Sequence, residues 1–339
     1  MKKAIALVAA LTMAASMTAC GSKAEEAPAA ASSAAAESTA AEESADSYTI
    51  GICQLVQHPA LDAATEGFMD AIKEDLGDSV TFDEQNASGD SATCATIVNQ
   101  FVSSNVDLIL SNATAPLQAA AAATDSIPIL GTSVTDYATA LEIDDWTGAT
   151  GRNISGTSDL APLADQAAML NELFPEAKNV GILYCSAEPN SKYQAEVITE
   201  ALTGMGYTCK DYAFADSNDI ASVVTSATSE ADVLYVPTDN TAASNTEVIN
   251  NICEPAGIPV IAGEEGICKG CGVATLSISY YDLGYTTGKM AVEILTKGTD
   301  VATMDVQFAP NVTKEYMADR CEKLGVKVPD DYVAIEVEE

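Results

Sequence analysis

From Tyr48 onward, short apolar runs rich in β-branched residues alternate with longer stretches in which apolar residues recur every three or four positions. The run Tyr48–Gln54 predicts a strand. The stretch beginning near Pro59 predicts a helix with Leu61, Phe68 and Ile72 on one face. Further strands are expected near residues 80–85, 108–112 and 128–134, with helices near 92–103 and 116–124. This order predicts parallel βαβ units with right-handed crossovers.

The same order recurs in the second half of the chain, with strands expected near residues 179–185, 208–213, 233–237 and 259–263. Pro128 and Pro259, each in an Ile-Pro pair before a strand, are 131 residues apart (259 − 128). The first strands of the two halves begin at Tyr48 and Asn179, with the same separation (179 − 48). Coincidence is the alternative, because Ile-Pro often precedes a strand, but the equal offsets favour a duplicated α/β lobe.

Four more elements are expected beyond the second repeat: a strand at 273–279, a helix from Tyr280 to about Thr296, a strand at 306–308 and a helix around 314–324. Lying outside both repeats, these segments are well placed to cross between two lobes. Doubly wound lobes bind ligands outside the carboxyl ends of their strands. A ligand clamped between two such lobes needs convergent polar groups, and closure is a hinge motion.

The first 47 residues follow a different pattern. Two lysines precede an apolar run from Ala4 to Ala15, and Met17–Ala19 leads to Cys20. A basic start, a short apolar core and small residues before a processing site predict an export signal over residues 1–19. The approach to Cys20 resembles the lipobox of bacterial lipoproteins, so we expect lipid on its sulfur. An ordinary secretory signal cleaved nearby is the alternative.

Residues 20–47 consist almost only of Ala, Ser, Glu, Gly, Thr, Asp and Pro. They contain no large apolar side chain, so this segment cannot bury enough surface to offset the entropy of ordering it. We expect a disordered tether between a membrane anchor and a folded body.

Composition limits the possible partners of the folded body. Hydrophobic residues make up 47% of the chain, and no segment after the signal approaches eighteen uninterrupted apolar residues. The net charge of −35 argues against nucleic acid and anionic lipid headgroups as partners. Scattered surface acids that keep the protein soluble explain this charge without a cationic ligand.

Eight of the nine cysteines remain if Cys20 is lipidated. An even number in an exported protein is compatible with disulfides, although several lie in expected strands or helices, where a buried thiol acts as a small apolar residue. Cys268 and Cys271 form the closest pair, in an expected loop. They are interpreted as a disulfide or as free thiols, ahead of half a metal site or a redox centre, because a lone CxxC is weak evidence for zinc.

The loops that follow the expected strands are polar and compact. They are residues 54–59, 86–90, 112–116 and 133–136 in the first half, and 186–191, 216–219 and 238–241 in the second. Hydroxyls and backbone N–H groups at helix N-termini suit a ligand carboxylate. Carboxylates such as Glu188 or Asp239 suit a ligand ammonium. Together the loops favour a zwitterion, although each one alone is equally explained as turn and capping residues.

Catalytic motifs are scarce. His58 is the only histidine, so any Ser-His-Asp or Cys-His relay must use it, and no Gly-x-Ser-x-Gly elbow occurs. The chain also has no Gly-rich phosphate loop. The sequence therefore favours a binding protein over an enzyme, with no cofactor and no metal.

Several segments together resemble the ABC transporter substrate-binding proteins that include tryptophan and tyrosine receptors. The matching segments are Ile50–Gln54, His58–Ala63, Asn86–Ala87, Asn153–Asp159, Glu188–Ser191, Pro237–Thr241 and Ser279–Gly284. They occur in the expected order over nearly the whole folded body. The chain departs from the family pattern at Gln57, where Glu is common, and in its extra cysteines.

The resemblance implies a type I periplasmic-binding-protein fold, in which two α/β lobes are joined by three hinge crossings. The expected N-terminal lobe is residues 48–157 plus about 276–303, and the C-terminal lobe is residues 158–275 plus about 304–339. The implied role is delivery of an aromatic or hydrophobic amino acid to an ABC permease and its ATPase. The expected receptor is a monomer outside the cytoplasm, anchored to the membrane by lipid.

The resemblance also implies roles for particular residues. Thr114 and the loop containing Ser186, Asn190 and Ser191 are expected to bind the α-carboxylate. Asp239, supported by Glu188, is expected to bind the ammonium, with Asn240 beside it. The side-chain end is expected to face Gln54, His58, Asn86 and Tyr280 or Tyr281.

Two other functions remain open at this stage. The same fold can bind a nucleoside, a sugar or another metabolite, since fold does not decide ligand. A surface thiol-redox protein that uses Cys268 and Cys271 is the more remote alternative.

Overall fold

The computed structural model describes residues 47–309 and 311–336. The expected signal peptide, the lipidation at Cys20 and all of the tether except Ser47 lie outside the described residues. Within the described ranges, no helix is both long enough and apolar enough to cross a membrane.

Six parallel strands form the first sheet, in the order β11-β5-β4-β3-β1-β2. They are β1 (Tyr48–Gln54), β2 (Val80–Asn86), β3 (Leu108–Asn112), β4 (Ile129–Val134), β5 (Ile154–Ser158) and β11 (Gln307–Phe308). The three strands β3, β4 and β5 are buried along their whole length. Such burial is typical of a parallel sheet covered on both faces, and it explains their almost continuous apolar or small-residue sequences.

Helices cover both faces of this sheet. They are α1 (Pro59–Leu76), α2 (Ser91–Ser104), α3 (Thr114–Ala123), α4 (Tyr137–Leu141) and α11 (Tyr280–Lys297), with short 3₁₀ turns η1 (Gly77–Ser79) and η2 (Val301–Thr303). Successive side chains of a strand point to opposite faces of the sheet. On β1, Cys53 therefore packs with α2 and α3, whereas Ile52 packs with α1 and α11.

The second sheet has seven strands in the order β13-β12-β10-β9-β8-β6-β7, and only the β10–β12 pair is antiparallel. Its strands are β6 (Asn179–Cys185), β7 (Thr208–Phe214), β8 (Val233–Val236), β9 (Val260–Ala262), β10 (Ala274–Ser277), β12 (Thr313–Tyr316) and β13 (Val333–Ala334). The helices between them are α5 (Leu163–Leu173), α6 (Pro189–Gly204), α7 (Ile220–Thr228), α8 (Asn240–Ala243), α9 (Thr246–Ala256), α10 (Glu265–Cys271) and α12 (Ala318–Leu324).

The two sheets repeat one topology. The order β5-β4-β3-β1-β2 in the first corresponds strand by strand to β10-β9-β8-β6-β7 in the second. The repeat offset of 131 residues also holds for the structure, because β1 and β6 begin at Tyr48 and Asn179 and β4 and β9 begin at Ile129 and Val260. The predicted fold class, two doubly wound α/β lobes, is confirmed.

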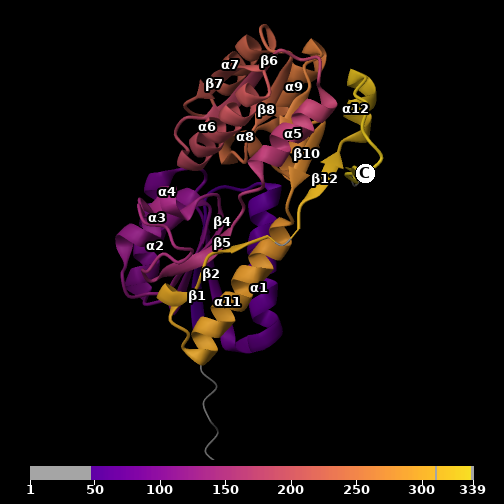
Figure 1. Ribbon diagram of the computed structural model, residues 1–339. Helices are drawn as coiled ribbons and strands as arrows, with labels where there is room; N and C mark the ends of the chain where they lie inside the picture. Colours follow the sequence, from indigo (N-terminus) through magenta and orange to yellow (C-terminus); the bar gives the residue numbers. More distant parts are fainter. Residues whose placement is uncertain (1–46, 310, 337–339) are drawn as a thin grey trace, which may run out of the picture. The chain divides into compact units, whose positions relative to one another are not determined.

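The chain crosses between the lobes three times: after β5, after β10 and after β11. The second crossing returns the chain to the first lobe as α11, which lies beside α1 (Figure 1). The two helices approach closely because Gly67 and Gly284 have no Cβ, which at either position would collide with backbone of the facing helix.

Three details differ from the sequence-based expectations. The third crossing follows residue 308 rather than 304, because Gln307 and Phe308 pair with β5. The helix expected around 314–324 begins only at Ala318, because residues 313–316 pair with the free edge of β10. Cys268 and Cys271 lie in helix α10 rather than in a loop.

Candidate functional site

A narrow cavity of about 10 Å³ lies between the lobes, at the carboxyl ends of their strands. Its first-lobe and crossing residues are His58, Leu61, Ser133, Asp159 and Tyr280, and its second-lobe residues are Asn190, Thr238, Asp239, Asn240, Ala243 and Glu264. Ligands bind at this edge in doubly wound sheets. None of the described lining residues is a lysine or an arginine.

Three polar atoms in the lining have no hydrogen-bond partner among the described residues. They are Oδ1 of Asp159, Oγ of Ser133 and Nδ1 of His58. The three side chains are 5%, 6% and 7% exposed, so solvent does not supply the missing bonds freely. Buried polar groups are normally paired, and unpaired atoms that share one cavity therefore point to a ligand.

Asp159 lies at the first crossing, directly after β5. Its Oδ2 accepts a hydrogen bond of 2.9 Å from the hydroxyl of Tyr280, which begins α11 at the second crossing. Burial raises the pKa of Asp159, whereas hydrogen bonds from Tyr280 and Thr135 lower it. The Tyr280 hydroxyl thus holds the carboxylate through Oδ2, while Oδ1 has no partner among the described residues.

His58 precedes Pro59 at the start of α1 and reaches across to the second lobe. Its Nε2 lies 3.3 Å from Oδ1 of Asn240. The Asn240 amide is oriented by Glu188, whose carboxylate accepts from its Nδ2 at 2.7 Å. Nε2 of His58 must therefore carry the hydrogen. Because burial lowers the pKa of His58, the ring is neutral and Nδ1 presents a lone pair.

Ser133 has a strained backbone. Its φ of 55° is in the left-handed region, which non-glycine residues rarely adopt outside functional or turn positions. The irregular pairing of β4 with β5 falls between Gly131 and Val134. This local distortion accompanies the position of the Ser133 hydroxyl in the cavity lining.

Asp239 is almost fully buried, and both of its carboxylate oxygens are engaged. Oδ2 accepts from the backbone N–H of Cys185 at 2.6 Å, and Oδ1 caps α8 by accepting from the N–H of Ala242 at 2.7 Å. Burial and the nearby Glu188 raise its pKa to about 8. Asp239 therefore ties α8 to the end of β6 as well as lining the cavity.

Glu188 serves the same helix and does not line this cavity. Its Oε1 accepts from the backbone N–H and hydroxyl of Thr241, at 2.9 and 2.7 Å. Its Oε2 accepts from the backbone N–H of Asn240 at 3.0 Å, in addition to the Asn240 amide. Donors at the N-terminus of α8 thus use both oxygens of the Glu188 carboxylate.

Glu264 is the third carboxylate in the lining. It caps α10, with backbone N–H groups of Gly266 and Ile267 donating to its two oxygens. Burial raises its pKa to about 7. Glu264 also lies 131 residues after Ser133 (264 − 133), so the two are equivalent positions in the duplicated lobes.

The structure brings five of the twelve expected ligand residues into this cavity: His58, Asn190, Asp239, Asn240 and Tyr280. Three others from the first lobe lie outside the lining. The Gln54 amide is used within its own lobe by Asp62, Val56 and Thr65. Asn86 is exposed and accepts from the N–H of Ser88, and Thr114 is buried in the first turn of α3.

The remaining expected residues also lie elsewhere. The exposed Ser186 donates to the carbonyl of Phe214, and the buried Ser191 contacts Glu188 and Asn190. Tyr281 is 38% exposed and donates to Asp70 on the outer face of α1. Of the two adjacent tyrosines, only Tyr280 faces the cavity.

The sequence-based list of ligand residues omitted Ser133, Asp159, Thr238 and Glu264, although the first three lie in segments that the sequence singled out. Asp159 directly follows β5 and Glu264 lies two residues after β9, and a carboxylate just after a strand was a usable signal. The 131-residue repeat also relates Ser133 to Glu264. The backbone strain at Ser133 has no counterpart in the sequence pattern.

A second groove of about 210 Å³ adjoins the cavity and shares Asn190 and Asn240 with it. Its apolar wall comes from both lobes and consists of Leu55, Val56, Ala115, Ala187 and Ala215. The groove could hold an apolar substituent of a ligand whose polar end lies in the cavity.

The eight cysteines of the described residues are free thiols. Cys268 and Cys271 are buried on α10, and burial raises the pKa of each above its usual value. In the described ranges, no group of three or more His, Cys, Asp or Glu side chains is arranged to hold a metal ion. Buried thiols with raised pKa values are poor nucleophiles.

A family model described as "ABC transporter substrate binding protein" matches residues 49–338. The "Tyrosine-binding protein" of Clostridioides difficile (strain R20291) is 36% identical over 260 residues, which are 76% of this chain and 75% of that protein.

Two solved structures are similar over most of their length. One is an ABC domain from Streptococcus pneumonia in complex with L-Trp, with a TM-score of 0.80, 32% identity and coverage of 84% of this chain and 96% of that one. The other is the ligand-free, open structure of a substrate-binding protein with adhesive properties from Clostridium difficile. It has a TM-score of 0.66 and 36% identity, and covers 86% of this chain and 100% of that one.

Proposed function

Because the chain belongs to the family of ABC transporter substrate-binding proteins, we propose that it is a receptor that clamps an aromatic amino acid between its lobes and delivers it to an ABC permease. Proteins of this family that serve importers work outside the cytoplasm, in agreement with the export signal expected from the sequence. The relatives that bind tyrosine and tryptophan support the ligand class. Lipid anchoring through Cys20 is part of the proposal.

The observation that carries the proposal is the set of three unpaired atoms in the cavity. A ligand ammonium has three N–H donors. Oδ1 of Asp159, Nδ1 of neutral His58 and Oγ of Ser133 can each accept one. A cation is also favoured over an anion because Asp159 lines the cavity and none of the described lining residues is a lysine or an arginine. We therefore assign the ammonium to Asp159 rather than to Asp239, whose oxygens already accept backbone N–H groups.

Donors for the carboxylate come from the second lobe. The hydroxyl of Thr238 accepts from Gln194 and keeps its own hydrogen, and the Asn240 amide has a second N–H beyond the one given to Glu188. The raised pKa values of Asp239 and Glu264 reduce their negative charge near neutral pH, which limits repulsion of a ligand carboxylate. The aromatic ring is assigned to the apolar wall of the adjoining groove.

Isothermal titration calorimetry with matched ligands tests this proposal. L-Tyrosine and L-tryptophan are compared with 3-(4-hydroxyphenyl)propionate, which lacks the amine, and with tyramine, which lacks the carboxylate. Loss of the amine should weaken binding by roughly 10- to 100-fold or more, because a hydrogen bond to a charged group contributes about 1.5–3 kcal/mol. Equal affinity for L-tyrosine and its deaminated analogue would contradict the assignment, and no binding of any amino acid would refute the receptor function.

A further inference from the structure

One buried hydrogen bond joins the two lobes beside the cavity. Nε2 of Gln194, on α6 of the second lobe, lies 3.3 Å from Oγ1 of Thr135, which follows β4 in the first lobe. Both side chains are 2% exposed. This contact can exist only while the lobes are together, because the partners belong to different sheets.

The Gln194 amide is held in one orientation by its own lobe. Its Oε1 accepts from the backbone N–H of Thr238 at 3.2 Å, and its Nε2 donates to Oγ1 of Thr238 at 2.5 Å. The amide nitrogen is therefore the end that faces Thr135, and the Thr135 oxygen is the acceptor.

Thr135 is in turn held beside Asp159. The hydroxyl of Ser158 donates to the Thr135 carbonyl at 2.7 Å, and the backbone N–H of Asp159 donates to the Val134 carbonyl at 3.3 Å. The Thr135 hydroxyl is also one of the donors that lower the pKa of Asp159 against the larger opposing effect of burial. Because the Thr135 oxygen accepts from Gln194, the hydroxyl keeps its own hydrogen for a bond within the first lobe.

We propose that Thr135 is a positioning residue that couples ligand recognition to lobe closure, by accepting from Gln194 of the second lobe and donating to the Asp159 carboxylate. The assignment of a ligand contact to Asp159 rests on the proposed function, whereas the interlobe bond does not. In the chain Gln194–Thr135–Asp159, each donor points toward the negative charge, an arrangement in which hydrogen bonds strengthen one another. Opening the lobes removes the Gln194 bond, so the carboxylate is best fixed for the ligand when the lobes are closed.

The test compares Thr135→Val, which removes the hydroxyl at nearly constant volume, with Thr135→Ser, which keeps it. Ligand affinity is measured by calorimetry with L-tyrosine and L-tryptophan. Compactness is measured by small-angle X-ray scattering before and after these ligands are added. Thr135→Val should weaken binding by about tenfold or more, chiefly through faster dissociation, and should give a larger radius of gyration. Thr135→Ser should resemble the wild type in both.

Tyr280→Phe serves as a comparison, because it removes the other Asp159 donor without touching the interlobe bond. It should weaken binding while leaving the compactness of the ligand-saturated protein unchanged. Melting temperatures of all variants without ligand identify any loss of folding. If the wild type binds no amino acid but Thr135→Val is still less compact than Thr135→Ser, the receptor function fails and the closure role stands. Equal behaviour of Thr135→Val and Thr135→Ser in affinity and compactness overturns the inference.

Discussion

At the scale of single residues, the buried carboxylates that line one cavity differ in which of their oxygens already accept hydrogen bonds. Asp239 was expected from the sequence as a ligand residue, because it lies in a strand-end loop that resembles the family, and it lines the cavity. Its two backbone hydrogen bonds were not predictable, because they depend on the distance between β6 and α8. Asp159 could be suspected from its position after a strand, but its free oxygen becomes evident only when every neighbouring donor is known.

The pair Asp159→Asn and Asp239→Asn separates the two roles. Asp159→Asn should raise the dissociation constant of the amino acid by at least roughly 30-fold, because losing one charge of a buried pair costs about 2–5 kcal/mol. Asp239→Asn replaces an N-cap acceptor and should mainly lower the melting temperature, with a cost of about 1–2 kcal/mol. Calorimetry and thermal unfolding measure both effects. If Asp239→Asn weakened ligand binding and Asp159→Asn mainly lowered the melting temperature, the ammonium would be assigned to Asp239 instead.

Glu264 predicts a pH dependence of stability. Its folded pKa of about 7 is above the ordinary value for glutamate, so the folded state holds its proton more tightly than the unfolded state does. Stability from this group is complete at pH values below about 4.5 and is lost as the pH rises toward and through 7, by roughly 3 kcal/mol. Glu264→Gln should therefore flatten the fall in the unfolding free energy between pH 5 and pH 8, as measured by urea titration. If the unfolding free energy fell equally with pH in the wild type and in Glu264→Gln, Glu264 would not titrate in this way.

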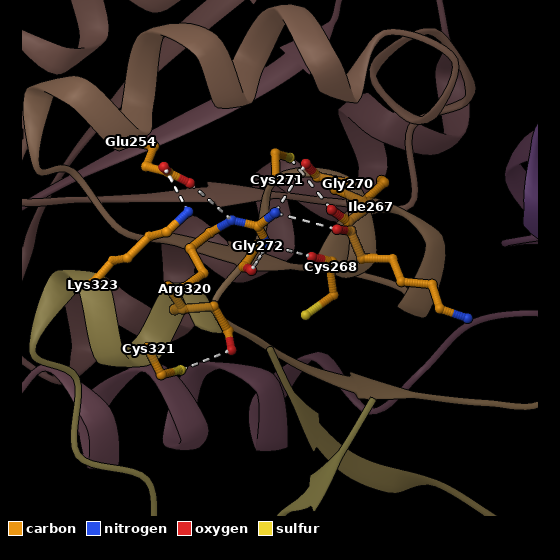
Figure 2. Close-up of polar contacts among 11 residues, drawn as sticks. Glu254, Ile267, Cys268, Gly270, Cys271, Gly272, Arg320, Cys321 and Lys323 are labelled. Carbon is orange, nitrogen blue, oxygen red and sulfur yellow. Dashed lines mark hydrogen bonds and ion pairs between the residues drawn. The ribbon is translucent and has the colours of Figure 1, made fainter. Parts of the chain in front are cut away.

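At the scale of elements, α10 is a helix that the sequence pattern did not predict. Its seven residues include Gly266 and Gly270, and the sequence predicted a loop with a close cysteine pair. Both ends are instead stabilised by distant or buried side chains. Glu264 caps the start, and Arg320 of α12 donates to the carbonyls of Cys268, Lys269, Gly270 and Gly272 at the end. Figure 2 shows the guanidinium directed at this end of the helix.

Replacing Arg320 tests the importance of this contact. Arg320→Met should lower the unfolding free energy by about 2–4 kcal/mol, because carbonyls in a largely buried site lose their donors. Lys323→Met is the matched control. It lies on the same helix and also contacts Glu254, but its side chain is 59% exposed, so its loss should cost less than about 1 kcal/mol. Similar costs for both variants in urea unfolding would contradict the structural role assigned to Arg320.

At the scale of the whole molecule, the alternation of apolar runs was sufficient to predict two doubly wound lobes. The repeat between Pro128 and Pro259 reflects a topology that the two sheets share strand by strand. The crossing after β11 was placed too early, because a two-residue strand such as Gln307–Phe308 has almost no sequence signature. The contacts between lobes were also inaccessible from sequence, since His58 and Asn240 are 182 residues apart along the chain.

The relation of the lobes agrees with a closed receptor. Direct contacts span the cleft at His58–Asn240 and Thr135–Gln194. The structure is also more similar to the L-Trp complex than to the open, ligand-free relative, although the open relative has the higher sequence identity. Closure of this kind brings the Asp159 carboxylate and the Thr238 hydroxyl into one cavity, so that a single zwitterion can contact both lobes.

The central claim is that the amino group of the ligand is bound by Asp159 between the closed lobes. A crystal structure of the protein with L-tyrosine or L-tryptophan tests it most directly. The account predicts that the ligand nitrogen lies about 2.7–2.9 Å from Oδ1 of Asp159, the distance of a charge-assisted hydrogen bond, with His58 and Ser133 as its other contacts. A ligand nitrogen bound to Asp239 instead, or a ligand bound outside this cavity, would contradict it.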